Sequence, residues 1–135
     1  MMLSDCLRYL WAAPATVVGL APAALACAFG ATVRVTDGVL EVAGARSDRL
    51  RRFGRSSRRR GGGRFVAITF GHVVIGQSHA VLDELRAHEH EHVRQYERWG
   101  VLFFAAYLGS SAAQWWCGRD PYRDNRFERQ ARAAE

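Results

Sequence analysis

The pattern of apolar positions begins with a long uncharged run. Residues 9–29 carry no charged side chain over 21 positions, about the length that a membrane-spanning helix needs. Pro14, Gly19 and Pro22 weaken a helix, but membrane helices tolerate them. A preceding Arg8 and small residues at the end of the run are also typical of a signal peptide. We favour an uncleaved membrane anchor over a signal peptide or a buried core helix, because arginine-rich chain follows it.

Alternating apolar and polar residues predict two β-hairpins in the next part of the chain. In residues 32–42, two strand-like runs flank Asp37-Gly38, which is a strong signal for a type I′ turn. In residues 65–75, two further runs flank Gly71-His72, where glycine in the first turn position fits type II′. Between the hairpins, residues 44–64 are rich in Arg, Ser and Gly and predict a mobile basic loop.

A helical period replaces the alternation after the second hairpin. Ser78 is a plausible N-cap, and the helix is expected to run to about Trp99 and to end at Gly100. The period places one stripe of side chains toward the interior and turns His90 and Glu91 away from it, so we expect solvent around His90. The residues of that stripe are Leu85, His88, His92, Tyr96 and Trp99, with Glu89 and Gln95 at its margins.

The next segment, residues 100–117, contains no charge and is followed by a polar tail that predicts a short helix from about Asp124. A single membrane crossing here would put the tail and the preceding helix on opposite sides of the bilayer. The segment is therefore expected to be buried in the domain or to lie along a membrane, with Trp115 and Trp116 at the interface.

The chain is basic, and the positions of its basic residues say more about function than their number does. The formal net charge is +6, and all 19 basic residues are arginine. Ten of them lie between residues 34 and 64, with only Phe53 and Phe65 as interleaved aromatic residues. Nucleic-acid binding is thus the least favoured reading, while contact with anionic lipid, a cytoplasmic topology signal and a plain flexible loop stay open.

The predicted long helix carries the candidate chemistry. His88-Glu89-x-x-His92 places two imidazoles one turn apart on the same helix face, where both can bind one Zn²⁺. Glu89, beside the first histidine, can activate a metal-bound water as a general base. The three cysteines form no CxxC pair, so the sequence offers no thiolate zinc site.

A zinc hydrolase needs a third protein ligand, and Glu128 is the best candidate. It lies on a separate predicted helix, 36 residues beyond His92. The same residue also completes a capping box with Asn125, so two roles compete for its side chain. If it is a ligand, two imidazole nitrogens and one carboxylate oxygen should converge to about 3–3.5 Å of one another.

The combination of HExxH with a glutamate on a later helix resembles the gluzincin clan of metallopeptidases in a minimal form. Residues 88–100 and 120–131 look like small membrane-associated bacterial proteins of this type, and the resemblance covers roughly residues 65–132. It implies that His88, His92 and Glu128 bind zinc, that Glu89 is the general base, and that a preceding strand lines the cleft. The implied reaction is attack of the activated water on a peptide bond.

These observations predict an α+β protein. We expect an apolar membrane segment in residues 1–30, and one zincin-like domain in residues 31–135 in which antiparallel hairpins pack with the two ligand-bearing helices. The expected partners are a peptide or protein substrate and membrane lipid, and the expected location is a membrane, with the domain in the cytoplasm.

Two features depart from the usual peptidase pattern and keep an alternative open. The residues between Glu89 and His92 are charged or polar where the clan has uncharged ones, and no single residue is assigned to stabilise the oxyanion. Tyr96, Tyr122 and His72 are the candidates for that role. The alternative function is a non-catalytic, membrane-associated metal-binding or interaction module.

Overall fold

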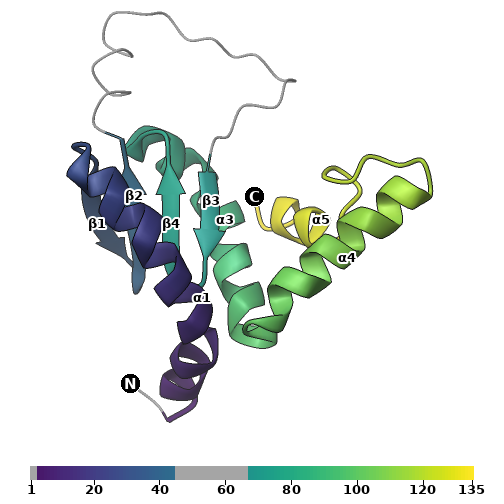
Figure 1. Ribbon diagram of the computed structural model, residues 1–135, viewed down its shortest axis with the longest axis horizontal. Helices are drawn as coiled ribbons and strands as arrows, with labels where there is room; N and C mark the ends of the chain where they lie inside the picture. Colours follow the sequence, from purple (N-terminus) through teal and green to yellow (C-terminus); the bar gives the residue numbers. More distant parts are fainter. Residues whose placement is uncertain (1–2, 45–66) are drawn as a thin grey trace, which may run out of the picture.

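The protein has an α+β architecture of helices around one four-stranded sheet (Figure 1). The structure is a computed structural model, and it describes residues 3–44 and 67–135. Its elements are α1 (Leu3–Ala28), β1 (Thr32–Thr36), β2 (Val39–Ala43), β3 (Ala67–Phe70), β4 (Val73–Gly76), α3 (His79–Trp99), α4 (Leu102–Trp116) and α5 (Arg126–Arg132). The predicted fold class is confirmed. The predicted basic loop, apart from Gly44, lies outside the described residues.

Both predicted hairpins form, with the turns that their glycines favour. In the β1–β2 turn, Asp37 has φ 50° and Gly38 has φ 78°, and two positive φ values in succession define type I′. In the β3–β4 turn, Gly71 has φ 57° and is the only one of the two turn residues with a positive φ, as in type II′. The turn residues therefore fix the strand registers locally.

The two hairpins join into one sheet through a parallel pairing of β2 with β4, which the sequence did not predict. The pairing matches Leu40 with Val73 and Ala43 with Gly76, and the strand order is β1-β2-β4-β3. As a result β3 lies at one edge of the sheet, facing the side where α3 and α4 meet (Figure 1).

Helices cover both faces of the sheet, with α1 on one side and α3 on the other (Figure 1). The alternation of side chains along the strands produces the two interfaces. Val42 and Val73 pack with Ala23 of α1, whereas Val74 packs with Leu82 and Val93 of α3. A layer of helix on each side of the sheet gives two small cores, and a third lies where Ala12 and Ala15 of α1 meet Tyr96, Phe103 and Phe127 of the other helices.

The first helix packs through small residues, on the sheet at Ala23 and against α3, α4 and α5 at Ala12 and Ala15, and it exposes large ones. Ala12, Ala15 and Ala23 are buried, and a Cβ added at Gly19 would lie 2.6 Å from Cβ of Phe70. Within the described residues, Cys6–Ala28 is the one helix long and apolar enough to cross a membrane. Length and composition alone do not separate such a span from a core helix or a signal sequence, which pass the same test.

A buried carboxylate ties the first hairpin to α3. Glu41 is 2% exposed, and it accepts hydrogen bonds from Arg34 Nε at 2.9 Å and from Arg86 Nε at 3.2 Å. Burial raises the pKa of Glu41, but the hydrogen bonds from the two guanidinium groups outweigh burial, so its pKa lies below the ordinary value of 4.5.

This lowered pKa makes the contribution of Glu41 to stability dependent on pH. A depressed folded-state pKa gives stability that is present above the ordinary pKa and is lost as pH falls through the folded-state value. We expect Glu41→Gln to cost about 1–3 kcal/mol at neutral pH. The difference in free energy of unfolding between wild type and variant, measured with urea, should become smaller as the pH falls. A difference that stays constant with pH would contradict this assignment. The control is Asp83→Asn, at a half-exposed partner of the same arginines, which should change the free energy of unfolding little.

Candidate metal centre

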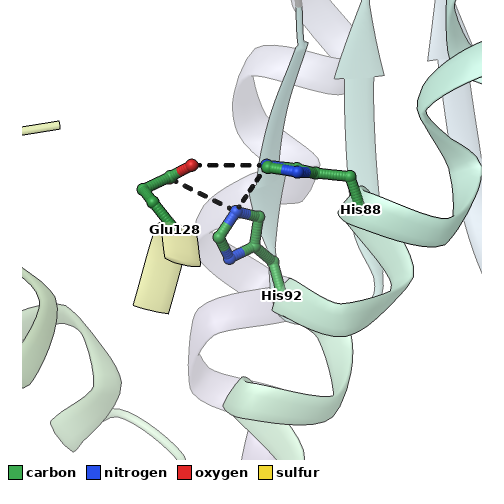
Figure 2. Close-up of side chains that lie close together, drawn as sticks. All are labelled: His88, His92 and Glu128. Carbon is green, nitrogen blue, oxygen red and sulfur yellow. Dashed lines mark hydrogen bonds and ion pairs between the residues drawn. The ribbon is translucent and has the colours of Figure 1, made fainter. Parts of the chain in front are cut away.

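The long helix α3 presents the two motif histidines toward the interior, as the helical period predicts. It begins after Ser78, whose hydroxyl accepts a hydrogen bond from the Val81 backbone N–H at 3.3 Å. It ends at Gly100, which has φ 56°. His88 and His92 are 6% and 8% exposed, and their Nε2 atoms lie 3.2 Å apart (Figure 2).

Glu128 reaches the same point from α5, which Asn125 holds in place. The Asn125 side chain caps α5 by accepting from the Phe127 backbone N–H at 2.9 Å. Its amide nitrogen donates to the Tyr107 carbonyl at 3.1 Å and to the Ser111 hydroxyl at 2.7 Å, which fastens α5 to α4. Glu128 is 3% exposed and turns to the histidines (Figure 2), which is the direction that a shared metal site requires.

The three side chains converge at the separation that one metal ion requires. His88 Nε2 lies 3.3 Å from Glu128 Oε2, and His92 Nε2 lies 3.4 Å from Glu128 Oε1. Each residue offers one ligand atom within 4.8 Å of the others, and all three residues are buried. These distances agree with the range expected from the sequence. That the cluster binds a metal, and that the metal is zinc, stays a prediction.

The outer hydrogen bonds of the two imidazoles decide which nitrogens face the cluster. His92 Nδ1 lies 2.9 Å from Gln95 Oε1, and His88 Nδ1 lies 3.0 Å from Glu135 Oε1. Amide and carboxylate oxygens are acceptors, so each neutral ring donates through Nδ1 and keeps a lone pair on Nε2. Two such lone pairs, 3.2 Å apart beside a carboxylate, need a cation or a proton between them.

The remaining polar atom of the cluster points to the same requirement. Glu128 Oε2 is buried and has no hydrogen-bond partner among the described residues, although it lies 3.3 Å from His88 Nε2. Buried carboxylate oxygens are normally satisfied, and a metal ion is one way to satisfy them. The donor set of two imidazoles and one carboxylate fits zinc, which commonly binds these ligands in catalytic sites.

Without a metal, the cluster is held by charge. Burial lowers the pKa of His88, but the carboxylates of Glu128 and Glu89 nearby outweigh it, so the pKa is raised. Burial raises the pKa of Glu128, but the imidazoles of His88 and His92 and the hydrogen bond from Tyr107 hold it well below its usual range. The carboxylate is therefore ionised, as a metal ligand must be.

Gln95 orients His92, a role that the sequence did not indicate. Its side chain is 1% exposed, and its amide nitrogen donates to the Phe127 carbonyl at 3.1 Å and to Gln130 Oε1 at 3.3 Å. These bonds fix the amide so that its oxygen faces the His92 ring. Gln95 thus connects α3 to α5, the two helices that carry the three residues of the cluster.

We expect Gln95→Leu to weaken zinc binding about 10–100-fold, because partners that orient a metal-binding histidine typically contribute that much. The matched control is Gln130→Leu, which removes one partner of Gln95 at an exposed position and should change affinity little. Competition with a chelating dye measures both. Equal affinity of Gln95→Leu and wild type would show that the amide does not orient the ligand.

Glu89 lies in the wall of the cavity that contains the three ligand residues. The cavity has a volume of about 290 Å³ and lies between the edge strand β3 and the helices α3 and α4. Glu89 is 6% exposed, and its Oε2 accepts a hydrogen bond from the Thr69 hydroxyl at 2.7 Å. The edge strand thus both lines the cavity and orients the carboxylate.

The structure separates the three residues that the sequence offered as partners for an oxyanion. Tyr96 and Tyr122 line the cavity of the metal cluster. His72 lines a different cavity, where it stacks on Tyr9 and lies 3.1 Å from Glu97. Tyr107, which sequence reasoning missed, also lines the metal cavity and donates to Glu128 Oε1 at 2.7 Å.

His90 and Glu91, the two residues between Glu89 and His92, are both shielded from solvent to a large extent. His90 does point away from the cluster, toward Glu41, but the prediction that solvent surrounds it is wrong. Its Nε2 is buried, 3.8 Å from Glu41 Oε1, and burial lowers its pKa. Glu91 is 8% exposed and pairs with Arg94 and Arg98. Both side chains therefore contact other residues of the protein instead of open solvent.

Comparisons of the chain with family models, with curated proteins and with solved structures find no match. The cluster and its cavity are therefore the features from which a function can be inferred. What they establish is a buried His-His-Glu group able to hold a metal ion. The likeness to gluzincins stays a prediction based on the motif residues.

Proposed function

We propose that the protein is a zinc-dependent, membrane-associated peptidase with His88, His92 and Glu128 as metal ligands and Glu89 as general base. One observation carries the proposal: Glu89 lines the same cavity as the three converging ligand residues. A metal site that serves only structure has no need of a carboxylate base in an accessible cavity beside it.

The roles of the residues follow from their positions. A zinc ion at this site would polarise a peptide carbonyl and lower the pKa of a water molecule. Glu89 would take the proton of the attacking water and return it to the leaving amine. Thr69 supports that role because its hydrogen bond fixes one carboxylate oxygen. Gln95 and Glu135 keep the Nε2 atoms of the histidines directed inward.

The test is hydrolysis of fluorogenic peptides by the zinc-loaded full chain. We expect cleavage that a chelator abolishes and added zinc restores. The peptide set should include large apolar residues, because Phe103, Phe104 and Leu108 line the cavity. If protein with a measured full complement of zinc cleaves none of the set above the rate of the metal-free chain, the peptidase assignment is wrong.

A non-catalytic metal-binding module is the second candidate. It is favoured by His90 and Glu91, the charged or polar residues that stand between Glu89 and His92 where the peptidase pattern has uncharged ones. In that case zinc should raise the melting temperature by mass action, without any hydrolysis. The two candidates share the metal site and differ only in what Glu89 does.

Membrane attachment and a cytoplasmic position of the domain are part of the same proposal. They are supported by the apolar α1, whose outer face exposes Leu10, Val17 and Leu25, and by the arginine-rich chain that follows the first hairpin. Lipid and a peptide or protein substrate are the proposed partners.

A further inference from the structure

The helix α4 has an inverted arrangement of polar and apolar side chains. Its three polar residues other than tyrosine, Ser110, Ser111 and Gln114, are all at least partly shielded and bind other parts of the domain. Ser111 accepts from Asn125, Ser110 accepts from the Arg126 backbone, and Gln114 accepts from Arg119. The exposed positions carry no charged side chain, and the indole N–H groups of the two tryptophans are their only polar side-chain groups. These positions are Leu102, Phe104, Ala105, Leu108, Gly109, Ala112, Ala113, Trp115 and Trp116.

The exposed positions form one continuous arc. At about 100° per residue they cover roughly half of the helix circumference, and the shielded positions cover the other half. Leu108 is 59% exposed and Trp116 is 84% exposed. Helices of soluble proteins place their polar residues outward and their apolar residues toward the core. Exposure of this apolar face to water is therefore unfavourable.

The width and ends of the arc favour lipid as its partner. A single facing helix covers only a narrow seam and would leave much of such a wide arc in water. Lipid covers the whole arc at once. Along the sequence, the charged residues nearest to α4 are arginines at its two ends, Arg98 before it and Arg119 after it, and both are exposed. Arginines beside an apolar helix suit anionic headgroups, and tryptophan favours the same interfacial layer.

The return of the chain along α4 fixes how the helix can lie. Tyr107, Ser110 and Ser111 contact residues of α5 or its N-cap, so the domain occupies one whole side of α4. In Figure 1 the chain after α4 turns back toward α3, which agrees with these contacts. A helix with the domain along its length can touch a bilayer only with its free side and lies in the plane of the interface.

The exposed face of α4 and the metal cavity share two residues. Phe104 and Leu108 are about half exposed, and both also line the cavity. Phe104 stacks against Phe70 of β3, with ring centroids 6.1 Å apart, so it forms part of the wall between the helix and the edge strand. The cavity therefore opens beside the apolar face.

We infer that the outer face of α4 lies in the interfacial layer of a membrane and presents the mouth of the metal cavity to that layer. The substrate class that follows, which rests on the proposed peptidase, is a peptide whose apolar side chains reside in the membrane interface. The contact with lipid itself does not depend on catalysis.

The experiment places a single label on α4 in the full chain. Cys6, Cys27 and Cys117 are replaced, and an environment-sensitive fluorophore is attached in Ala112→Cys or, as the matched control, in Ala80→Cys, an exposed alanine of α3. Vesicles of phosphatidylcholine and phosphatidylglycerol carry a nitroxide on the acyl chain. We expect a blue shift and strong quenching at position 112, and neither at position 80.

Two other results would overturn the inference. Position 112 could stay open to an aqueous quencher in the presence of vesicles, or it could become shielded without lipid through association of two chains. For the substrate, Ala112→Glu should slow cleavage of a vesicle-bound apolar peptide several-fold and leave cleavage of a short soluble peptide unchanged, since residue 112 does not line the cavity. Equal rates on the vesicle-bound peptide contradict the inferred substrate class. If wild type cleaves neither peptide, the proposed peptidase fails, whereas the label still decides the contact with lipid.

Discussion

Purified protein should bind about one zinc ion per chain, and the His92→Ala and Glu128→Ala variants should bind none under the same conditions. The expectation follows from the convergence of three ligand atoms, in which His92 Nε2 lies 3.2 Å from His88 Nε2 and 3.4 Å from Glu128 Oε1. Removing either residue leaves two ligands, fewer than the three that zinc hydrolases normally use. Metal analysis after dialysis measures the stoichiometry.

The same experiment has a control inside the HEHEH run. His90→Ala removes a histidine two positions from each ligand, and its ring faces Glu41 instead of the cluster. It should keep the full zinc content. Zinc should also raise the melting temperature of wild type and of His90→Ala, because a ligand that binds only the folded state stabilises it. A wild type without zinc, or one whose zinc survives both ligand substitutions, would refute the site.

Local patterns in the sequence were enough to predict the parts of the fold that depend on near neighbours. Asp37-Gly38 forms its type I′ turn because both residues tolerate a positive φ. Ser78 and Gly100 bound α3 because a hydroxyl cap and a glycine are favoured at those ends. His88 and His92 share a face because four residues make about one helical turn.

Contacts between distant segments were beyond the same reasoning. The parallel pairing of β2 with β4 joins segments separated by residues 44–66, which show no pattern that specifies a partner. Thr69 reaches Glu89 only because this pairing leaves β3 at the sheet edge. Tyr107 reaches Glu128 only because α5 folds back on α4. None of these residues has a spacing that signals its role.

The uncharged segment 100–117 is an intermediate case. Its composition indicated burial or a membrane, and the spacing of Ser110, Ser111 and Gln114 already places them on one side of a helix. The sequence could not tell whether that side faces water or protein. The answer depends on Asn125 and Arg126 at the start of α5. The Asn125 side-chain amide donates a hydrogen bond to the Ser111 hydroxyl, and the Arg126 backbone N–H donates one to the Ser110 hydroxyl.

Replacement of Glu89 by glutamine should lower peptide hydrolysis about 10²–10⁴-fold while zinc content stays at the wild-type level. Glutamine has nearly the same shape, and its amide oxygen can still accept the hydrogen bond that Thr69 donates at 2.7 Å. It cannot accept the proton of an attacking water. Hydrolysis rates and metal analysis on the same preparation separate loss of the base from loss of the metal.

The matched control is Glu91→Gln, which makes the same chemical change two residues away on the same helix. Glu91 is also buried, but its carboxylate pairs with Arg94 and Arg98 and does not line the cavity. Its loss should lower stability and leave hydrolysis by the folded protein near the wild-type rate. If both variants lose activity equally, Glu89 acts through folding. If neither does, the base lies elsewhere and the zinc site serves another function.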